Sequence, residues 1–148
     1  MYTVTNNDDL NKAIFENKDK IILLYFGASW CGPCQKLKEN FHDDELMKNY
    51  DRLAIIYIDV DNDSFSNICD SYDVEALPTQ WFTLFEDFSM KRLDQIVGYD
   101  WEKFNYIYQM SVEYVDNLKN NKNVNSDENY DNNSSNNSEN NLDNNTIF

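Results

Sequence analysis

An apolar run at residues 21–26 leads almost directly into residues 30–34, which read Trp-Cys-Gly-Pro-Cys. The run is short and wholly apolar, which predicts a buried strand. The good helix formers that follow, beginning at Gln35, predict a helix. Cys31 and Cys34 are therefore expected where a strand passes into a helix, with Pro33 in the first turn, where a missing N–H costs nothing.

A thiol at this position faces the unpaired amide donors and the positive end of a helix, both of which stabilise a thiolate. Two intervening residues keep the sulfurs of Cys31 and Cys34 close enough to form a small disulfide ring. The same spacing also forms half of many zinc sites. A structural zinc ion needs four ligands, however, and the chain holds three Cys and one His, with Cys34 and His42 too far apart along one helix to share an ion. The pair therefore predicts thiol–disulfide chemistry, and we expect no metal and no cofactor.

Charge and composition limit the class of protein. The formal net charge of −15 disfavours nucleic acid and anionic membrane as partners. No stretch approaches the ~18 apolar residues that a membrane span requires. Residues 1–9 have neither the basic start nor the apolar core of a signal peptide, and three cysteines argue against a disulfide-stapled secreted scaffold. We therefore expect a cytoplasmic protein, where thiols remain reduced, and we expect a monomer.

The composition changes near residue 119. From there to the end, 13 of 30 residues are Asn, and apolar residues are too sparse to offset the entropy of ordering the segment. We predict one domain over residues 1–118 and a disordered, Asn-rich, low-complexity tail over 119–148. A passive solvated tail and an interaction tract both remain open for this segment.

The periodicity of apolar residues predicts strands and helices that alternate early and a hairpin that comes late. The expected strands are 2–5, 21–28 and 53–58, with hairpin strands 80–85 and 93–97 around a loop at 86–92, and the expected helices are 7–17, 33–50, 62–72 and a last one capped by Asp100. This order indicates an α/β fold with a mixed sheet covered by helices on both faces.

Several landmarks in this order resemble the thioredoxin family over roughly residues 1–118. They are the segment 30–34, the Asp-Val-Asp at 59–61 after a buried strand, the Leu-Pro-Thr at 77–79 before the hairpin, and Gly98 after it. The resemblance implies the thioredoxin fold, a central mixed sheet of about five strands flanked by about four helices. It also implies that Pro78 is cis and lies against the cysteine pair.

The resemblance implies a protein-disulfide reductase that works through a dithiol–disulfide cycle. Cys31, exposed at the helix start, would attack a substrate disulfide, and the more buried Cys34 would then attack Cys31 and release the reduced substrate. The partners would be disulfide-containing proteins and an NADPH-dependent thioredoxin reductase that recharges the pair. Such a chain would carry electrons in cell redox homeostasis.

The same resemblance assigns a substrate surface around the cysteines. Trp30, Leu77 and Pro78 would form a flat, mostly apolar face that receives an extended substrate strand. Gly32 would let the substrate approach, and Pro33 would stiffen the turn and favour reducing chemistry.

Some positions depart from the family pattern. Tyr25 stands where thioredoxins usually carry a buried Asp, and no Lys appears at 53–58 to pair with one. Gly27 stands where a second Trp is common, which should remove packing beside the site. These departures keep an alternative open, in which the domain is a binding module or adaptor whose redox cycle is slow or dispensable. Cys69 is expected to be an inward-facing core residue of the helix 62–72.

Overall fold

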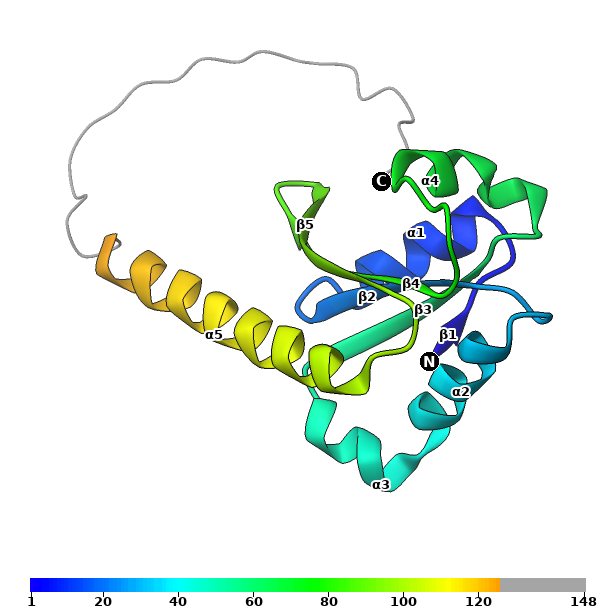
Figure 1. Ribbon diagram of the computed structural model, residues 1–148. Helices are drawn as coiled ribbons and strands as arrows, with labels where there is room; N and C mark the ends of the chain where they lie inside the picture. The colour runs from blue at the N-terminus through cyan, green and yellow to red at the C-terminus, as the bar shows by residue number, and fades with distance from the viewer. Residues whose placement is uncertain (126–148) are drawn as a thin grey trace, which may run out of the picture.

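The computed structural model describes residues 1–125, and its centre is a five-stranded sheet of order β1-β3-β2-β4-β5 (Figure 1). The elements in chain order are β1 (Tyr2–Thr3), α1 (Asn7–Glu16), β2 (Ile21–Gly27), α2 (Gly32–His42), α3 (Asp44–Met47), β3 (Leu53–Asp59), α4 (Ser66–Ser71), β4 (Thr79–Glu86), β5 (Ser89–Val97) and α5 (Trp101–Asn125). Short 3-10 helices occupy Lys48–Tyr50 and Asp63–Phe65. The expected order of strands and helices is confirmed.

The sheet is mixed, as the sequence predicts. β3 pairs in parallel with both β1 and β2, whereas β4 pairs antiparallel with β2 and with β5. β2 therefore lies at the centre of the sheet, hydrogen-bonded on both sides, and every residue of it is buried. This is why its sequence is a continuous apolar run rather than an alternating one.

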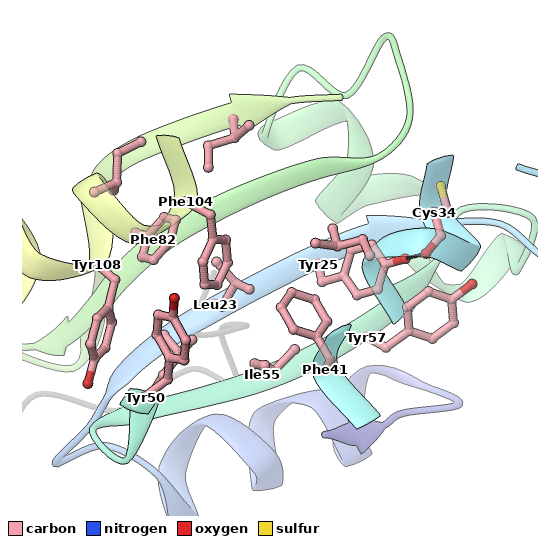
Figure 2. Packing of buried hydrophobic residues seen from close by; sticks show 14 of the residues in the cluster. Leu23, Tyr25, Cys34, Phe41, Tyr50, Ile55, Tyr57, Phe82, Phe104 and Tyr108 are labelled. Carbon is pink, nitrogen blue, oxygen red and sulfur yellow. Dashed lines mark hydrogen bonds between the residues drawn. The ribbon is translucent and has the colours of Figure 1, made fainter. Parts of the chain in front are cut away.

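Successive residues of β2 contribute to two separate cores on opposite faces of the sheet. Ile21, Leu23 and Tyr25 belong to a cluster that contains both Cys31 and Cys34, together with residues of α2 and α5 such as Phe41 and Phe104 (Figure 2). The intervening residues belong to the other cluster, which is covered by α1 and α4: Ile22, Leu24, Phe26, Leu10, Ile14 and Ile68. One face of the sheet thus carries the cysteines.

The helix predicted for residues 33–50 is interrupted, so that prediction is wrong in its length. α2 ends at His42, and Asp43 adopts an extended conformation with φ −80° and ψ 99°. The Asp43 carboxylate accepts a hydrogen bond from the backbone N–H of Leu46 at 3.0 Å and so caps α3. Asp is a strong N-cap residue, and here the cap begins a new helix.

The hairpin also differs from its prediction. The loop expected at 86–92 is a two-residue turn, because β4 continues to Glu86 and β5 begins at Ser89. The turn residues Asp87 and Phe88 both have positive φ, 52° and 60°. Positive φ at both central residues gives the turn whose twist matches the two strands.

The last helix extends beyond the predicted domain boundary. The Asp100 carboxylate accepts a hydrogen bond from the backbone N–H of Lys103 at 2.9 Å, which confirms the predicted cap. α5 continues past residue 118 to Asn125, and Figure 1 shows it running beyond the sheet. The remainder of the predicted tail, 126–148, lies outside the described residues. Among residues 1–125, no helix combines the length and the apolar character needed to cross a bilayer.

Candidate redox site

The two cysteines lie where β2 passes into α2, as predicted. Cys31 is the N-cap residue of α2, and its sulfur accepts a hydrogen bond from the backbone N–H of Cys34 at 3.3 Å. Pro33 occupies the first turn of the helix. Cys31 and Cys34 form a disulfide, with their Cα atoms 5.2 Å apart. The capping bond directs a free helix N–H at the sulfur of Cys31, an arrangement that favours a thiolate there once the pair is reduced.

Cys31 is less accessible than expected, whereas Cys34 is buried as expected. Cys31, expected to be exposed, is 5% exposed, and Cys34 is 1% exposed. Cys31 nevertheless lines a surface groove, whereas Cys34 is not among the residues of its wall. The sequence correctly predicted that Cys34 is more buried than Cys31, but it did not predict how little of Cys31 is exposed.

The groove beside Cys31 has a volume of about 690 Å³. Four of the predicted substrate-binding residues line it: Trp30, Gly32, Pro33 and Leu77. The fifth, Pro78, is buried and is not part of the lining. The remaining lining residues, which sequence reasoning did not assign, are Val60, Ser66, Cys69, Asp70, Val74, Glu75 and Ala76. They come from α4 and from the segments beside it, so their place at the groove depends on the fold rather than on a local motif.

Trp30, which lines this groove, is held in place by a hydrogen bond to Asp61. Its side chain is 70% exposed, and its indole Nε1–H donates a hydrogen bond to Oδ2 of Asp61 at 2.8 Å. Asp61 is the last residue of the Asp-Val-Asp segment, which begins at the end of β3. An exposed indole normally samples several rotamers, and the bond to Asp61 restricts it.

The Leu77–Pro78 peptide bond is cis, as the resemblance implied. The carbonyl oxygen of Pro78 accepts a hydrogen bond from the backbone N–H of Gly98 at 2.8 Å. Gly98 has φ +90°, a conformation that L side chains rarely adopt, so glycine is favoured there. The Pro and Gly landmarks of the sequence are therefore joined in space by a hydrogen bond.

Tyr25 lies directly beneath the start of α2. Its hydroxyl donates a hydrogen bond to the backbone oxygen of Cys34 at 2.6 Å, as Figure 2 shows. The ring is fully buried, with ring centroids 5.4 Å from Phe41 and 5.1 Å from Tyr57. Burial raises the pKa of Tyr25 well above its usual value, with a further increase from Tyr57. The phenol is therefore neutral at physiological pH and acts as a hydrogen-bond donor.

Tyr25 and Tyr57 also occupy the space beside Gly27. A Cβ atom on Gly27 would lie 3.0 Å from Cε2 of Tyr57 and 3.3 Å from Cε2 of Tyr25. The two tyrosine rings therefore fill the space that a side chain at position 27 would begin to occupy. The absence of a side chain at Gly27 thus leaves room for the aromatic rings of Tyr25 and Tyr57.

Cys69 is partly buried and packs at the margin of the second core, so the expectation of a core residue holds only in part. Its side chain also lines the groove beside Cys31. Burial raises the pKa of the Cys69 thiol, and the neighbouring Asp70 raises it further. At neutral pH Cys69 is therefore a protonated thiol, less reactive than an unperturbed cysteine.

A family model described as Thioredoxin matches residues 2–100 of the chain. The chain belongs to the thioredoxin family. Thioredoxin H4-2 of Oryza sativa subsp. japonica is 36% identical over 100 residues, which cover 66% of this chain and 70% of that protein. The thioredoxin of Coprinus comatus is 33% identical over 95 residues, covering 64% of this chain and 82% of the relative.

Solved structures of thioredoxins have the same fold. The germline-specific thioredoxin Deadhead of Drosophila melanogaster superposes with a TM-score of 0.64 at 30% identity, covering 74% of this chain and 98% of that one. The thioredoxin fold predicted from the sequence is confirmed, with five α-helices within residues 1–125 where about four were expected. As a thioredoxin with a CxxC disulfide, the protein is a thiol–disulfide oxidoreductase of the protein-disulfide reductase type.

Proposed function

We propose that Cys31 is the nucleophile and Cys34 the resolving thiol in the reduction of protein disulfides. The observation that carries this division of roles is the difference in placement of the two sulfurs. Cys31 caps α2 and borders the groove, whereas Cys34 is 1% exposed and lies behind it. A substrate disulfide that enters the groove meets Cys31 first.

The reaction transfers two electrons from the dithiol to the substrate. The Cys31 thiolate attacks one substrate sulfur, the substrate S–S bond breaks, and the departing substrate thiolate takes up a proton. Cys34, as a thiolate, then attacks the Cys31 sulfur of this mixed disulfide. The second substrate thiolate leaves and is protonated, and the Cys31–Cys34 disulfide remains. No cofactor takes part in these steps.

The groove supplies the substrate surface in this proposal. Trp30 and Leu77 line the groove together with Cys31 and offer apolar contacts, and Gly32 carries no side chain, with nothing within 4 Å of where a Cβ would lie. Pro33 stiffens the helix start, and the cis Pro78 sets the direction of the chain that follows Leu77. An extended substrate segment fits an open groove of this kind.

Trapping of mixed disulfides tests the roles of the two thiols. We expect Cys34→Ser, incubated with insulin, to accumulate a covalent adduct through Cys31 that dithiothreitol releases. Cys31→Ser should accumulate none, because Cys34 is inaccessible. Both variants should be made in a Cys69→Ser background, so that the third thiol does not contribute. Equal trapping by the two variants would contradict the assignment.

The oxidised pair needs an electron donor, and we propose an NADPH-dependent thioredoxin reductase. Membership of the thioredoxin family supports this partner. We also propose the cytoplasm as the location, although relatives include a thioredoxin of Arabidopsis thaliana described as chloroplastic. Consumption of NADPH at 340 nm, with a thioredoxin reductase and insulin, tests the partner. The rate should depend on this protein and vanish in Cys31→Ser. NADPH consumption that continued in that variant would refute the proposal.

A further inference from the structure

A second groove lies at the opposite end of β2 from the disulfide. β2 begins in this groove at Ile21 and ends near the redox site at Gly27. The groove has a volume of about 620 Å³ and is formed by the chain on either side of Lys20, the chain before β3, the end of β4 and the second half of α5. The reaction of the cysteines makes no use of it.

The groove combines an apolar floor with a basic rim. Four partly buried apolar residues form the floor: Leu84, Phe85, Val115 and Leu118. Five cationic side chains line it, Lys18, Lys20, Arg52, Lys119 and Lys122, against three acidic ones, Asp19, Asp51 and Glu86. The chain as a whole has only 12 Lys and Arg residues and a formal net charge of −15. A local excess of positive charge therefore stands out against an acidic protein.

Most of these cations lack an acidic partner. Arg52 pairs with Asp116 at 3.0 Å, and the ammonium group of Lys18 lies 4.4 Å from the ring centroid of Phe15. Within residues 1–125, Lys20, Lys119 and Lys122 form no ion pair. Three ammonium groups thus remain available to an acidic ligand.

We propose that this groove binds the chain's own acidic segment, residues 126–148. That segment contains five acidic residues, Asp127, Glu128, Asp131, Glu139 and Asp143, and no Lys, Arg or His. It also carries apolar residues that suit the floor of the groove, Leu142, Ile147 and Phe148. The complementarity is therefore both electrostatic and apolar.

The point of attachment favours this occupant over an acidic segment of another protein. Residue 126 follows directly on α5, whose Lys119 and Lys122 form part of the groove rim. At a rise of ~1.5 Å per residue, the helix ends only about 5 Å beyond Lys122. A short tether gives an effective concentration on the order of millimolar, so a free acidic peptide would have to be present at a comparable concentration to compete.

Paramagnetic relaxation in the full-length chain tests the proposal. A nitroxide is attached at Ser138→Cys in a Cys69→Ser background, with the Cys31–Cys34 pair kept oxidised so that the new thiol alone reacts. We expect strong relaxation enhancement at the backbone amides of Lys20, Glu86 and Leu118, and little at those around Trp30. Equal enhancement at both ends of the sheet would overturn the proposal.

Charge variants test whether the acidic residues of 126–148 and the lysines of the groove are what bind each other. Changing the five acids of 126–148 to their amides, or Lys119 and Lys122 to Glu, should abolish the enhancement at the groove. Raising the salt to about 1 M, where the Debye length is about 3 Å, should weaken it strongly. Lys103→Glu, on the same helix but outside the groove, is the matched control and should preserve it. Enhancement that survives the amide changes would overturn the proposal.

Two further outcomes are decisive. If a nitroxide-labelled chain relaxes the groove amides of an isotope-labelled, nitroxide-free chain in a mixture, the occupant is a second copy and the intramolecular proposal is refuted.

Insulin reduction should be unchanged in the five-amide variant, because the groove lies away from the disulfide. Loss of trapping by Cys31 would contradict the proposed catalytic roles and leave the groove measurements unaffected, so the two ideas fail independently.

Discussion

A single buried hydroxyl connects the central strand to the redox helix. Tyr25 donates to the backbone oxygen of Cys34, and its raised pKa keeps the phenol protonated over the physiological range. A protonated phenol can fix the position of Cys34 but cannot accept the proton that this thiol must lose before it attacks. We therefore assign to Tyr25 a positioning role and expect the proton to leave to solvent.

This assignment predicts how the mixed disulfide resolves. With no carboxylate at position 25, the rate of resolution should follow the ionised fraction of Cys34, which rises about tenfold per pH unit below the pKa of the thiol. The lifetime of the mixed disulfide should therefore shorten steadily from pH 6 to pH 9, as measured by acid quenching of single turnovers. A lifetime that is short at pH 7 and independent of pH would show that a base is present.

Removing the hydroxyl separates positioning from packing. Tyr25→Phe should lower the free energy of unfolding by about 0.5–1.5 kcal/mol, the net contribution of one hydrogen bond, while the pH profile of resolution keeps its shape. Urea unfolding measures the first effect. Tyr57→Phe, which leaves the bond to Cys34 in place, is the matched control. If the two variants lost the same free energy of unfolding, the loss could not be attributed to the hydrogen bond between Tyr25 and Cys34.

Among the elements, the β4–β5 hairpin has a turn that its sequence does not favour. Asp87 and Phe88 both adopt positive φ without a glycine, and Phe88 is 86% exposed. A non-glycine residue in this conformation costs roughly 1–2 kcal/mol, whereas glycine adopts it at little cost. The exposed ring recovers little of this through burial.

Phe88→Gly should therefore stabilise the protein by about 1 kcal/mol, since the relief of strain exceeds the added chain entropy of glycine. The midpoint of urea unfolding measures this. Phe88→Ala removes the same ring but keeps a Cβ atom, and it should give no comparable gain. A gain of equal size in both variants would trace the effect to the ring rather than to the backbone.

The elements also show which parts of the fold a sequence can predict. β2 and α2 were predictable because a continuous apolar run and a helix-start proline each act locally. The break at Asp43 was not, because an Asp within a helical pattern looks the same whether its side chain faces solvent or caps Leu46. The tight hairpin was missed because Asp87 and Phe88 lack the glycine that marks such turns.

At the scale of the molecule, the site is only partly encoded by its motif. The cysteines, Trp30 and Leu77 could be assigned from the sequence. Asp70, Val74 and Glu75 complete the groove only because the fold brings the segment around α4 to the same groove as the start of α2. The buried aromatic residues that support the site are likewise distributed along the chain. Among them and elsewhere in the core, burial is the main cause of raised pKa values at five tyrosines: Tyr25, Tyr50, Tyr57, Tyr72 and Tyr108.

These tyrosines predict the behaviour of the whole protein in alkali. In the unfolded chain they ionise near pH 10, whereas in the folded chain they keep their protons to higher pH. Their contribution to stability is thus fully present below about pH 10 and is lost as pH rises beyond it. Urea unfolding of a Cys69→Ser chain between pH 8 and 11 should show a decline that begins near pH 10. Tyr72→Phe should make the decline of the unfolding free energy with pH shallower. An unchanged decline in this variant would show that Tyr72 does not contribute to it.

The alternation of β2 between two cores has a consequence for how such a protein evolves. Substitutions at Ile21, Leu23 or Tyr25 alter the cluster that contains the cysteines, so they can retune the rate or potential of the redox pair. Substitutions at Ile22, Leu24 or Phe26 alter the opposite cluster, where neither active-site thiol lies. We therefore expect adjacent positions of one strand to experience different selection. A lineage can explore new redox behaviour on one face of the sheet while the other face preserves the fold.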